Sequence, residues 1–474
     1  MNISKYFTGK PAQKITVAIF IAILVLAFNV RKHTFNLPHI SGDQLHYVGL
    51  AFKLDTQGTS GYNLRGINID VNLQYPNLVR LVPTEDKGHL LTAMDNENIT
   101  YYDQALHHLP YGFPLAIMLS HNIFARGEPY YLLALPNAAE IIRNAPSGAG
   151  LRDFRFDPPV APKQFYSIII PLSFSLLLVI LTFFLAKEFY ESYAIALVAM
   201  FLVSISPIDI LTSQKLWSDD MTTALMVLAV LFYVLSVKKD KALLAFTGGL
   251  FCGLSILAKQ SGAFIIFAII IWHFITNFTR LFKKETFLTV IFDKKLILFG
   301  LGTFITAGYW FFKVLATYGS PFYRPQQANI SKVALTEWFK VVGSRPWHLY
   351  IAGIPYQNPL FSLAYISPFW LYFDRKRLKS TLFLLLWIAV FFYIFQVYFA
   401  GGGKEHRYML PAYPAFAILA GYIANHIRIF LDKYSKLYIG TALLIIILLA
   451  SAVWCIPMAM EIVFYNGALI LKPF

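Results

Sequence analysis

Long apolar runs separated by short polar connectors dominate the residue pattern of this chain. Each run is apolar on every face, whereas the strands of a transmembrane barrel alternate apolar and polar positions. The runs therefore predict membrane-spanning helices. Eleven spans are expected, at residues 15–30, 165–186, 193–210, 218–236, 242–258, 261–277, 296–316, 355–373, 380–400, 409–427 and 437–456. The expected fold is an all-α polytopic membrane protein that forms a single domain over residues 1–474.

Composition and charge agree with a membrane protein. Hydrophobic residues make up 57% of the chain and charged residues 14%, against roughly 45–50% apolar residues in soluble domains. The 40 Lys and Arg residues outnumber the 25 Asp and Glu residues, which gives a formal net charge of +15. These cations sit mostly between apolar runs, so they indicate membrane topology and affinity for a lipid bilayer, and no nucleic-acid partner is expected.

The basic connectors predict the orientation of the spans. Lysines precede the first run and no small-residue cleavage site follows it, so we expect an uncleaved signal-anchor with a cytoplasmic N-terminus. The connectors at 238–241, 280–295, 375–379 and 428–436 then all fall in the cytoplasm. This topology predicts two long extracytoplasmic loops, 31–164 and 317–354. No retrieval tail is visible, so a bacterial or archaeal plasma membrane is expected rather than the endoplasmic reticulum.

One apolar stretch in the first loop is too short for a span. Residues 112–125 are apolar over about a dozen positions before Arg126, whereas a spanning helix needs about twenty. If they crossed, residues 129–143 would have to cross back while carrying Glu140 and Arg143. We therefore expect a helix that lies along the outer membrane surface.

Acidic residues at the outward ends of two expected helices are candidates for chemistry. Asp43 follows the first span in the first loop, and it could serve only as a helix N-cap. Asp219 and Asp220 open the fourth span after Trp217-Ser218, where acidic residues favour a helix N-terminus. One of the two would suffice for that role.

Cations occupy two other outward ends. Lys259 lies in a hairpin between the fifth and sixth spans that is tight enough to hold it at the membrane boundary, where a snorkelling lysine is the alternative interpretation. Near the end of the chain, three glycines precede Lys404, Glu405, His406, Arg407 and Tyr408, which enter directly into a span. A flexible loop with an ordinary interfacial belt remains the alternative there.

Taken in order, these motifs resemble those of the GT-C superfamily of membrane glycosyltransferases, near the protein O-mannosyltransferase and lipid A aminoarabinose transferase group. The resemblance rests on an acidic motif followed by a tyrosine at 42–47, an SP…D stretch at 206–220, a "GL..L.K" hairpin at 253–259, and a "KE.RYMLP.YP" stretch at 404–414.

The resemblance implies transfer of a sugar from a polyprenyl-phosphate carrier to an acceptor hydroxyl on a protein, lipid or glycan at the extracytoplasmic face, with inversion at the anomeric carbon. It implies Asp43 as general base, and Lys259, Arg407 and Lys404 as ligands of the donor phosphate. Many relatives carry a second carboxylate where this chain has Gln44, so the resemblance leaves the sugar open.

Physical chemistry supports the same division of roles. A sugar phosphate already has a good leaving group, so the reaction needs a base for the acceptor and cations for the departing phosphate. An aspartate, with a reference pKa of about 3.9, is ionised at neutral pH unless it is buried. Asp219 or Asp220 could orient Lys259 or Arg407 or help to bind a divalent ion, while Glu405, His406 and Tyr408 are supporting candidates.

No Asp, Glu or His cluster has close metal-ligand spacing, so no metal and no other cofactor is expected, although a divalent cation stays open. The pair His107-His108 is expected at the surface. Two alternatives to sugar transfer are a GT-C-related polysaccharide or glycan ligase and a lipid-linked sugar transporter. Transporters place ionisable groups near the midplane and often have two related halves, and neither feature is visible in the residue pattern.

Overall fold

The computed structural model of the protein describes residues 11–32, 43–63, 67–71, 78–83, 106, 109–133, 165–319, 348–372, 374–398, 405–434 and 438–464. Large parts of the expected loops 31–164 and 317–354 lie outside the described residues, and so do Lys404 and the pair His107-His108. The backbone of Asp43 is described as the first residue of a helix, but its side chain is not.

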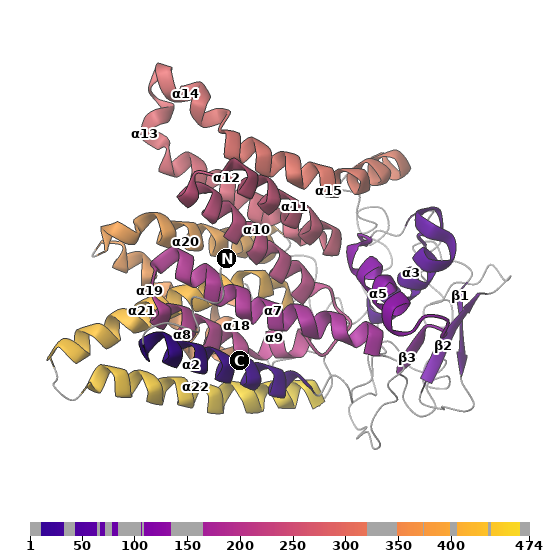
Figure 1. The fold of residues 1–474 in the computed structure, drawn as a ribbon, viewed down its shortest axis with the longest axis horizontal. Helices are drawn as coiled ribbons and strands as arrows, with labels where there is room; N and C mark the ends of the chain where they lie inside the picture. The colour runs from indigo at the N-terminus through magenta and orange to yellow at the C-terminus, as the bar shows by residue number, and fades with distance from the viewer. Residues whose placement is uncertain are drawn as a thin grey trace.

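A bundle of long helices forms most of the protein (Figure 1). Its long members are α2 (Pro11–Arg31), α7 (Phe165–Tyr190), α10 (Asp219–Lys239), α11 (Ala242–Ala258), α15 (Lys294–Tyr318), α20 (Leu378–Phe392), α21 (Tyr413–Tyr434) and α22 (Ile439–Phe464). Shorter helices are α8 (Tyr193–Ser204), α9 (Pro207–Thr212), α12 (Phe264–Thr276), α13 (Phe278–Leu281), α14 (Lys284–Ile291), α18 (Leu349–Gln357) and α19 (Ser362–Trp370). The 3₁₀ turns η4 (Gln260–Ala263), η5 (Pro359–Phe361), η6 (Arg375–Arg377) and η8 (His406–Ala412) and the π-helical segment η7 (Tyr393–Tyr398) connect them.

Several of these helices are able to cross a membrane. Among the described residues, six helical segments are long and apolar enough: Gln13–Arg31, Phe165–Tyr190, Asp219–Lys239, Arg375–Phe395, His406–Tyr434 and Ile439–Met460. Shorter apolar helices accompany them at Gly112–Phe124, Tyr193–Ser204, Ala242–Ala258 and Gln260–Thr276. The expectation of a helical integral membrane protein is confirmed, while the number eleven stays a prediction.

Two of the expected spans are not single helices. The run 193–210 is divided between α8 and α9, because Pro207 lacks an N–H group and Ser206 before it is extended, with ψ 120°. In the same way, an extended Asn358 before a proline divides the run 355–373 between α18 and α19. Hydrophobicity identified both runs, but new helical segments begin within them at Pro207 and Pro359.

A small antiparallel sheet corrects the expectation of an all-α chain. It consists of β1 (Ile67–Val71), β2 (Leu78–Pro83) and β3 (Tyr131–Leu133), in the order β1-β2-β3. Ile69 is paired with Leu81, and Val79 with Leu132. Such short strands give little alternation to detect in a sequence, and β3 pairs with a strand that is distant along the chain.

Two helices pack against each other beside this sheet at one end of the bundle (Figure 1). They are α3 (Asp43–Gln57), which continues into the turn η2 (Gly58–Gly61), and α5 (Gly112–Phe124). The helix expected at 112–125 is therefore confirmed as a helix, and at about 1.5 Å per residue it is shorter than the roughly 30 Å of a hydrocarbon core. Its position along a membrane surface stays a prediction.

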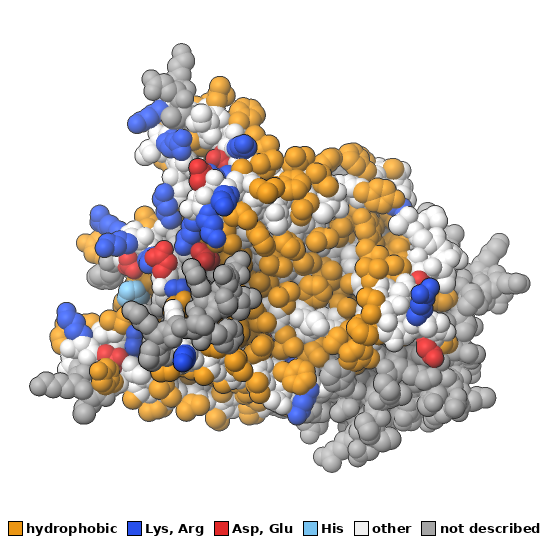
Figure 2. All heavy atoms as spheres, viewed as in Figure 1, with side chains coloured by type: hydrophobic (Ala, Val, Ile, Leu, Met, Phe, Trp, Pro, Cys, Tyr) orange, Lys and Arg blue, Asp and Glu red, His pale blue; other side chains and the backbone are white. Residues whose placement is uncertain are grey.

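The basic connectors gather at the opposite end of the bundle from α3 and α5, where Figure 2 shows Lys and Arg side chains clustered beside a broad apolar surface. Ion pairs join three of these connectors to neighbouring helix ends. Lys295 binds Asp240 at 2.6 Å, and Arg377 binds Glu191 at 3.1 Å. Lys238 also reaches Glu191, at 3.7 Å. The connectors expected on one side of the membrane thus share one end of the molecule.

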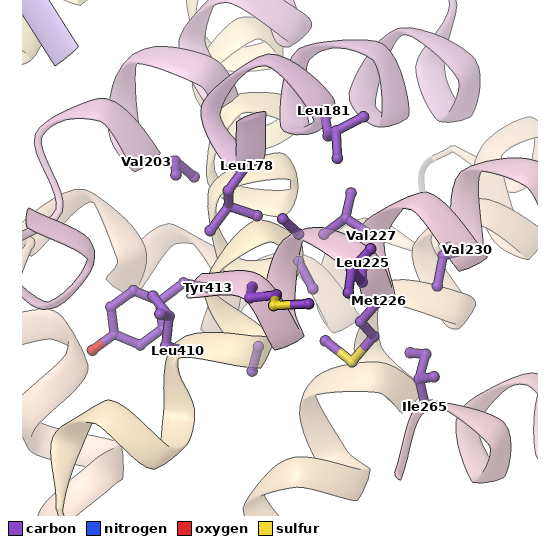
Figure 3. Packing of buried hydrophobic residues seen from close by; sticks show 14 of the residues in the cluster. Leu178, Leu181, Val203, Leu225, Met226, Val227, Val230, Ile265, Leu410 and Tyr413 are labelled. Atoms are coloured by element: carbon purple, nitrogen blue, oxygen red, sulfur yellow. The ribbon is translucent and has the colours of Figure 1, made fainter. Parts of the chain in front are cut away.

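The interior of the bundle is built from α7, α8, α10 and α21. Figure 3 shows Leu178 and Leu181 of α7 above Leu225 and Val227 of α10. The same cluster includes Leu410 from η8, which has no exposed surface. The turn η8 is therefore anchored to the core at one of its residues, and this fixes the polar residues His406, Arg407 and Tyr408 at the start of the same turn.

Candidate functional site

Lys259 and Arg407 converge on one carboxylate at the end of the bundle that carries α3. Lys259 Nζ lies 2.7 Å from Asp219 Oδ1, and Arg407 Nη1 lies 3.8 Å from Asp219 Oδ2. Asp219 begins α10 and Lys259 directly follows α11. Because these helices are antiparallel neighbours with a short connector, the start of one meets the end of the other. Residues predicted from three distant motifs are thus brought together.

Aromatic rings hold the two cations in place. The guanidinium of Arg407 lies 4.1 Å from the ring centroid of Trp217, and Lys259 Nζ lies 5.0 Å from that of Tyr408. Arg407 also donates a hydrogen bond from Nε to Glu405. Stacking on a ring face orients a guanidinium, so the position of Arg407 is defined by its neighbours.

The two neighbouring aspartates face different partners. Asp219 binds the cations, whereas Asp220 Oδ1 accepts a hydrogen bond from Thr212 of α9 at 2.9 Å. Adjacent residues of a helix point about 100° apart, so one side chain turns to the site and the other to the packing behind it. Asp220 therefore does not join Lys259 and Arg407 in this structure.

A buried ion pair that the residue pattern did not reveal lies behind Asp220. Arg31 at the end of α2 binds Asp209 of α9, and both side chains have no exposed surface. Ser175 of α7 links them, since its Oγ accepts from Arg31 Nε at 2.7 Å and donates to Asp209 at 3.0 Å. From the sequence, Arg31 was expected only as a basic residue at the end of the first span, because no neighbouring residue indicates that it is buried.

The first turn of α3 docks directly beside Asp219. The backbone N–H of Leu216 donates to Gln44 Oε1 at 3.1 Å, and the Tyr47 hydroxyl lies 2.9 Å from Ser218 Oγ. Gln44 is thus a docking residue in this structure. Asp43 precedes Gln44, so its backbone lies next to the segment that leads into Asp219.

Helix α5 connects α3 to the position of Lys259. The ring of Phe113 packs edge-on against Tyr47, with centroids 4.8 Å apart. Gly112 abuts the last residues of α11 so closely that a Cβ there would lie 2.6 Å from the carbonyl of Leu257. The glycine therefore permits an approach that any larger residue would block.

The remaining supporting candidates separate into two groups. Glu405 and Tyr408 lie beside Arg407, as described above. His406 faces α18, where a Cβ on Gly353 would come within 2.2 Å of its ring, and it packs edge-on against Tyr350 at 6.1 Å. His406 thus lies against α18 in this structure, and its supporting role stays a prediction.

The described side chains include no group of three or more His, Cys, Asp or Glu residues that could hold a metal ion. Asp43, whose side chain is not described, stands outside that finding. The expectation that no metal is required stays a prediction.

Comparison with known proteins identifies the family. Residues 117–471 match the Alg9-like mannosyltransferase family. No curated sequence matches the chain. The match begins after α3, so the motif around Asp43 is not part of it.

Solved structures share the fold at low sequence identity. The archaeal oligosaccharyltransferase AglB from Archaeoglobus fulgidus, in complex with an inhibitory peptide and a dolichol-phosphate, aligns with a TM-score of 0.56 and 13% identity over 96% of this chain and 56% of that one. ArnT from Cupriavidus metallidurans bound to undecaprenyl phosphate aligns with a TM-score of 0.53 and 13% identity over 95% of this chain and 76% of that one. The chain thus spans little more than half the length of AglB. The GT-C fold inferred from the motifs is confirmed. The chain belongs to the Alg9-like mannosyltransferase family.

Proposed function

We propose that the protein transfers mannose from a polyprenyl-phosphate-linked donor to an acceptor hydroxyl, with Lys259 and Arg407 binding the donor phosphate and Asp43 acting as general base. The family supports mannose as the sugar. The two structural relatives that were solved with dolichol-phosphate and undecaprenyl phosphate support the class of donor.

The observation that carries the proposal is the convergence of Lys259 and Arg407 on Asp219. Arg407 is positioned by Trp217 and Glu405, which fixes the geometry in which its guanidinium would meet phosphate oxygens. Lys259 keeps a quarter of its side chain exposed, which leaves it accessible to a ligand that arrives from the lipid. Lys404 is a further candidate of the same kind.

In the proposed reaction the acceptor oxygen forms a bond to the anomeric carbon while the bond from that carbon to the phosphate oxygen breaks. The electron pair of the broken bond goes to the phosphate, and the proton of the acceptor hydroxyl goes to the Asp43 carboxylate. Attack from the side opposite to the leaving phosphate inverts the anomeric carbon. The extra negative charge then develops on the phosphate, where fixed cations stabilise it most strongly.

The side of the membrane follows from the distribution of charge. The basic connectors gather at the end of the bundle opposite α3, whose first turn packs beside the segment before Asp219 (Figures 1 and 2). Cytoplasmic ends carry the excess of Lys and Arg in most membrane proteins. We therefore propose an extracytoplasmic site in a bacterial or archaeal plasma membrane, with a cytoplasmic N-terminus.

Binding of undecaprenyl phosphate to the purified protein tests the proposal without knowledge of the acceptor. We expect saturable binding to the wild type and a loss of about tenfold or more in affinity for Lys259→Ala and Arg407→Ala, since each removes a charge-assisted contact. Lys295→Ala, at the opposite end of the bundle, is the matched control. A panel of undecaprenyl-phosphate sugars then identifies the sugar consumed. Equal affinity in all four proteins would overturn the assignment of the phosphate site.

A further inference from the structure

The connection between α12 and α15 is longer than a turn requires. It covers residues 277–293, whereas residues 240 and 241 suffice between α10 and α11 at the same end of the bundle. Connections between helices usually take about 2–8 residues. The extra length folds into α13 and α14, which contact each other and project sideways from the bundle, at the end where the basic connectors gather (Figure 1). We call residues 277–293 the α13–α14 segment.

Large apolar side chains of the α13–α14 segment are exposed. Phe278 is 59% exposed, Phe282 76%, Leu288 62% and Phe292 64%. The rings of Phe278 and Phe282 pack edge-on, with centroids 4.9 Å apart. Residues four apart lie on the same face of a helix, so Leu288 and Phe292 form a second neighbouring pair. Grouped apolar side chains on a surface mark a site of interaction.

Contacts with the bundle fix the α13–α14 segment in place. His273 of α12 donates from Nε2 to the carbonyl of Val290 at 2.9 Å, and both side chains are buried. Asp293 caps α15, because its Oδ1 accepts from the N–H of Lys295 at 2.9 Å and from that of Leu296 at 3.1 Å. The position of Phe292 is therefore set by contacts on both sides of it along the chain, and its exposure is a defined feature of the fold.

Exposed cations accompany these apolar side chains. Arg280 and Lys283 stand on either side of Phe282 along the chain, and Lys294 begins α15. All three cations are exposed. The stretch 280–295 contains five Lys and Arg residues against two Asp and Glu residues. Aromatic and aliphatic side chains combined with Lys and Arg are typical of helices that lie at the boundary between headgroups and acyl chains, where they bind anionic lipid.

The neighbouring helix favours a bilayer over a water-soluble protein as the partner of the segment. Exposed apolar residues continue at helical spacing along α15, at Ile297, Leu301, Phe304 and Ile305. Residues 296–316 are one of the expected membrane spans, so we expect lipid to cover this stripe. A protein in water would cover the α13–α14 segment alone, whereas a bilayer covers its apolar side chains and the stripe with one surface.

We propose that the α13–α14 segment is an in-plane membrane anchor. Its Phe and Leu side chains insert into the leaflet at the basic end of the bundle, and Arg280, Lys283 and Lys294 bind anionic phospholipid headgroups there. With the proposed orientation, this is the cytoplasmic leaflet. The inference goes beyond sugar transfer and is independent of the proposed donor site, which lies at the other end of the bundle.

Fluorescence quenching tests the insertion. Phe282→Cys carries an environment-sensitive dye in the full chain, reconstituted as single molecules in nanodiscs of phosphatidylcholine and phosphatidylglycerol. Cys252 and Cys455 are buried, and the dye taken up by the wild type gives the background. We expect quenching by nitroxide-labelled lipid and a loss of iodide quenching relative to Lys376→Cys, an exposed control position at the same end. Equal iodide quenching at both positions would place residue 282 in water and overturn the proposal.

A lipid titration tests the cations. The triple variant Arg280→Gln, Lys283→Gln, Lys294→Gln is compared with the wild type in mixed micelles, and the unfolding temperature is followed as phosphatidylglycerol replaces phosphatidylcholine. One Lys or Arg near an anionic surface contributes about fivefold in affinity, so the phosphatidylglycerol content that gives half of the full stabilisation should rise by about tenfold or more.

A second triple variant is the matched control. It removes the same charge from exposed positions elsewhere at the basic end, with Lys239→Gln, Lys376→Gln and Lys433→Gln. We expect a smaller shift in this control. Equal shifts in the two triple variants, or no shift in the first, would show that the cations of the α13–α14 segment have no special role. Neither test uses a sugar donor, so its failure leaves the proposed function untouched.

Discussion

Gly112 offers the sharpest test of how the site is held together. A Cβ at this position would lie 2.6 Å from both the carbonyl carbon and the oxygen of Leu257 and 2.9 Å from the nitrogen of Ala258. These are backbone atoms, so they cannot rotate away as a flexible side chain would. Ordinary van der Waals contact between carbon atoms begins near 3.5 Å. In Gly112→Ala, either α5 or the end of α11 must therefore move by about 1 Å.

The expected effects follow from that displacement. Overpacking of this kind costs about 1–3 kcal/mol of stability. Lys259 comes directly after the displaced residues, and a misplacement of about 1 Å can reduce a rate by about a hundredfold. We expect Gly112→Ala to remain folded, to unfold at a lower temperature, and to transfer sugar at least tenfold more slowly than the wild type.

The assay measures release of undecaprenyl phosphate from a donor sugar together with the unfolding temperature of each variant. Gly300→Ala is the matched control, since a Cβ there meets nothing within 4 Å. It should leave the rate unchanged, and it should not destabilise α15 because alanine is the better helix former. If Gly112→Ala loses stability but transfers at the wild-type rate, α5 supports only the fold and the link from α5 to Lys259 is refuted.

Further predictions address single groups. Asp43→Asn should reduce transfer by about a hundredfold or more while undecaprenyl phosphate still binds, and a normal rate would make Asp43 a helix cap only. Arg407→Lys should lower donor affinity by about tenfold, because lysine lacks the planar fork that stacks on Trp217; unchanged donor saturation would remove Arg407 from the phosphate site. Burial lowers the pKa of Lys215 to about 8, so between about pH 8 and 10.5 this residue binds more protons in the unfolded chain than in the folded one. The unfolding temperature of the wild type should therefore rise relative to that of Lys215→Met as pH increases through this range. A pH-independent difference would contradict the burial of a titrating lysine. Arg31→Ala should destabilise the protein by about 3–5 kcal/mol, because it leaves Asp209 buried and unpaired, and a stability change within 1 kcal/mol would refute that pair.

The residue pattern predicted the elements of this protein better than their exact ends. Hydrophobicity located the helices of the bundle, because a bilayer demands long apolar segments. The prolines at the two helix breaks, Pro207 and Pro359, can be seen in the sequence. An apolar run on both sides of a proline also fits one kinked span, so the sequence alone did not predict the breaks. The strand β3 could not be predicted, because three residues that pair with a strand far along the chain show no periodic pattern.

The candidate site was predictable in its cations and less so in their partners. Lys259 stood out because a tight hairpin holds it at the membrane boundary, and Arg407 because it belongs to a contiguous charged run that enters directly into a span. Whether Asp219 or Asp220 would face them depends on helix phase, which a pair of adjacent acids does not reveal. Trp217 had no distinguishing signal, because the importance of an aromatic ring at a helix junction depends on what folds against it from far along the chain.

The arrangement suggests why α3 and α5 are built onto the bundle. Gln44 and Tyr47 fix the start of α3 to the residues before Asp219, while Phe113 and Gly112 carry that contact on to the end of α11. The proposed base and the proposed phosphate ligands are thereby held by one continuous set of contacts. A catalytic site that must meet a lipid-borne donor benefits from such fixed geometry, since little binding energy is then spent on ordering it.

The most direct test of the account is a cryo-electron microscopy structure of the protein with bound undecaprenyl phosphate. The account predicts that the phosphate lies within ion-pair distance, about 4 Å, of both Lys259 and Arg407, on the side of the cluster that faces the first turn of α3. Phosphate density elsewhere in the protein, with the Lys259–Asp219 and Arg407–Asp219 contacts intact and no ligand beside them, would contradict it.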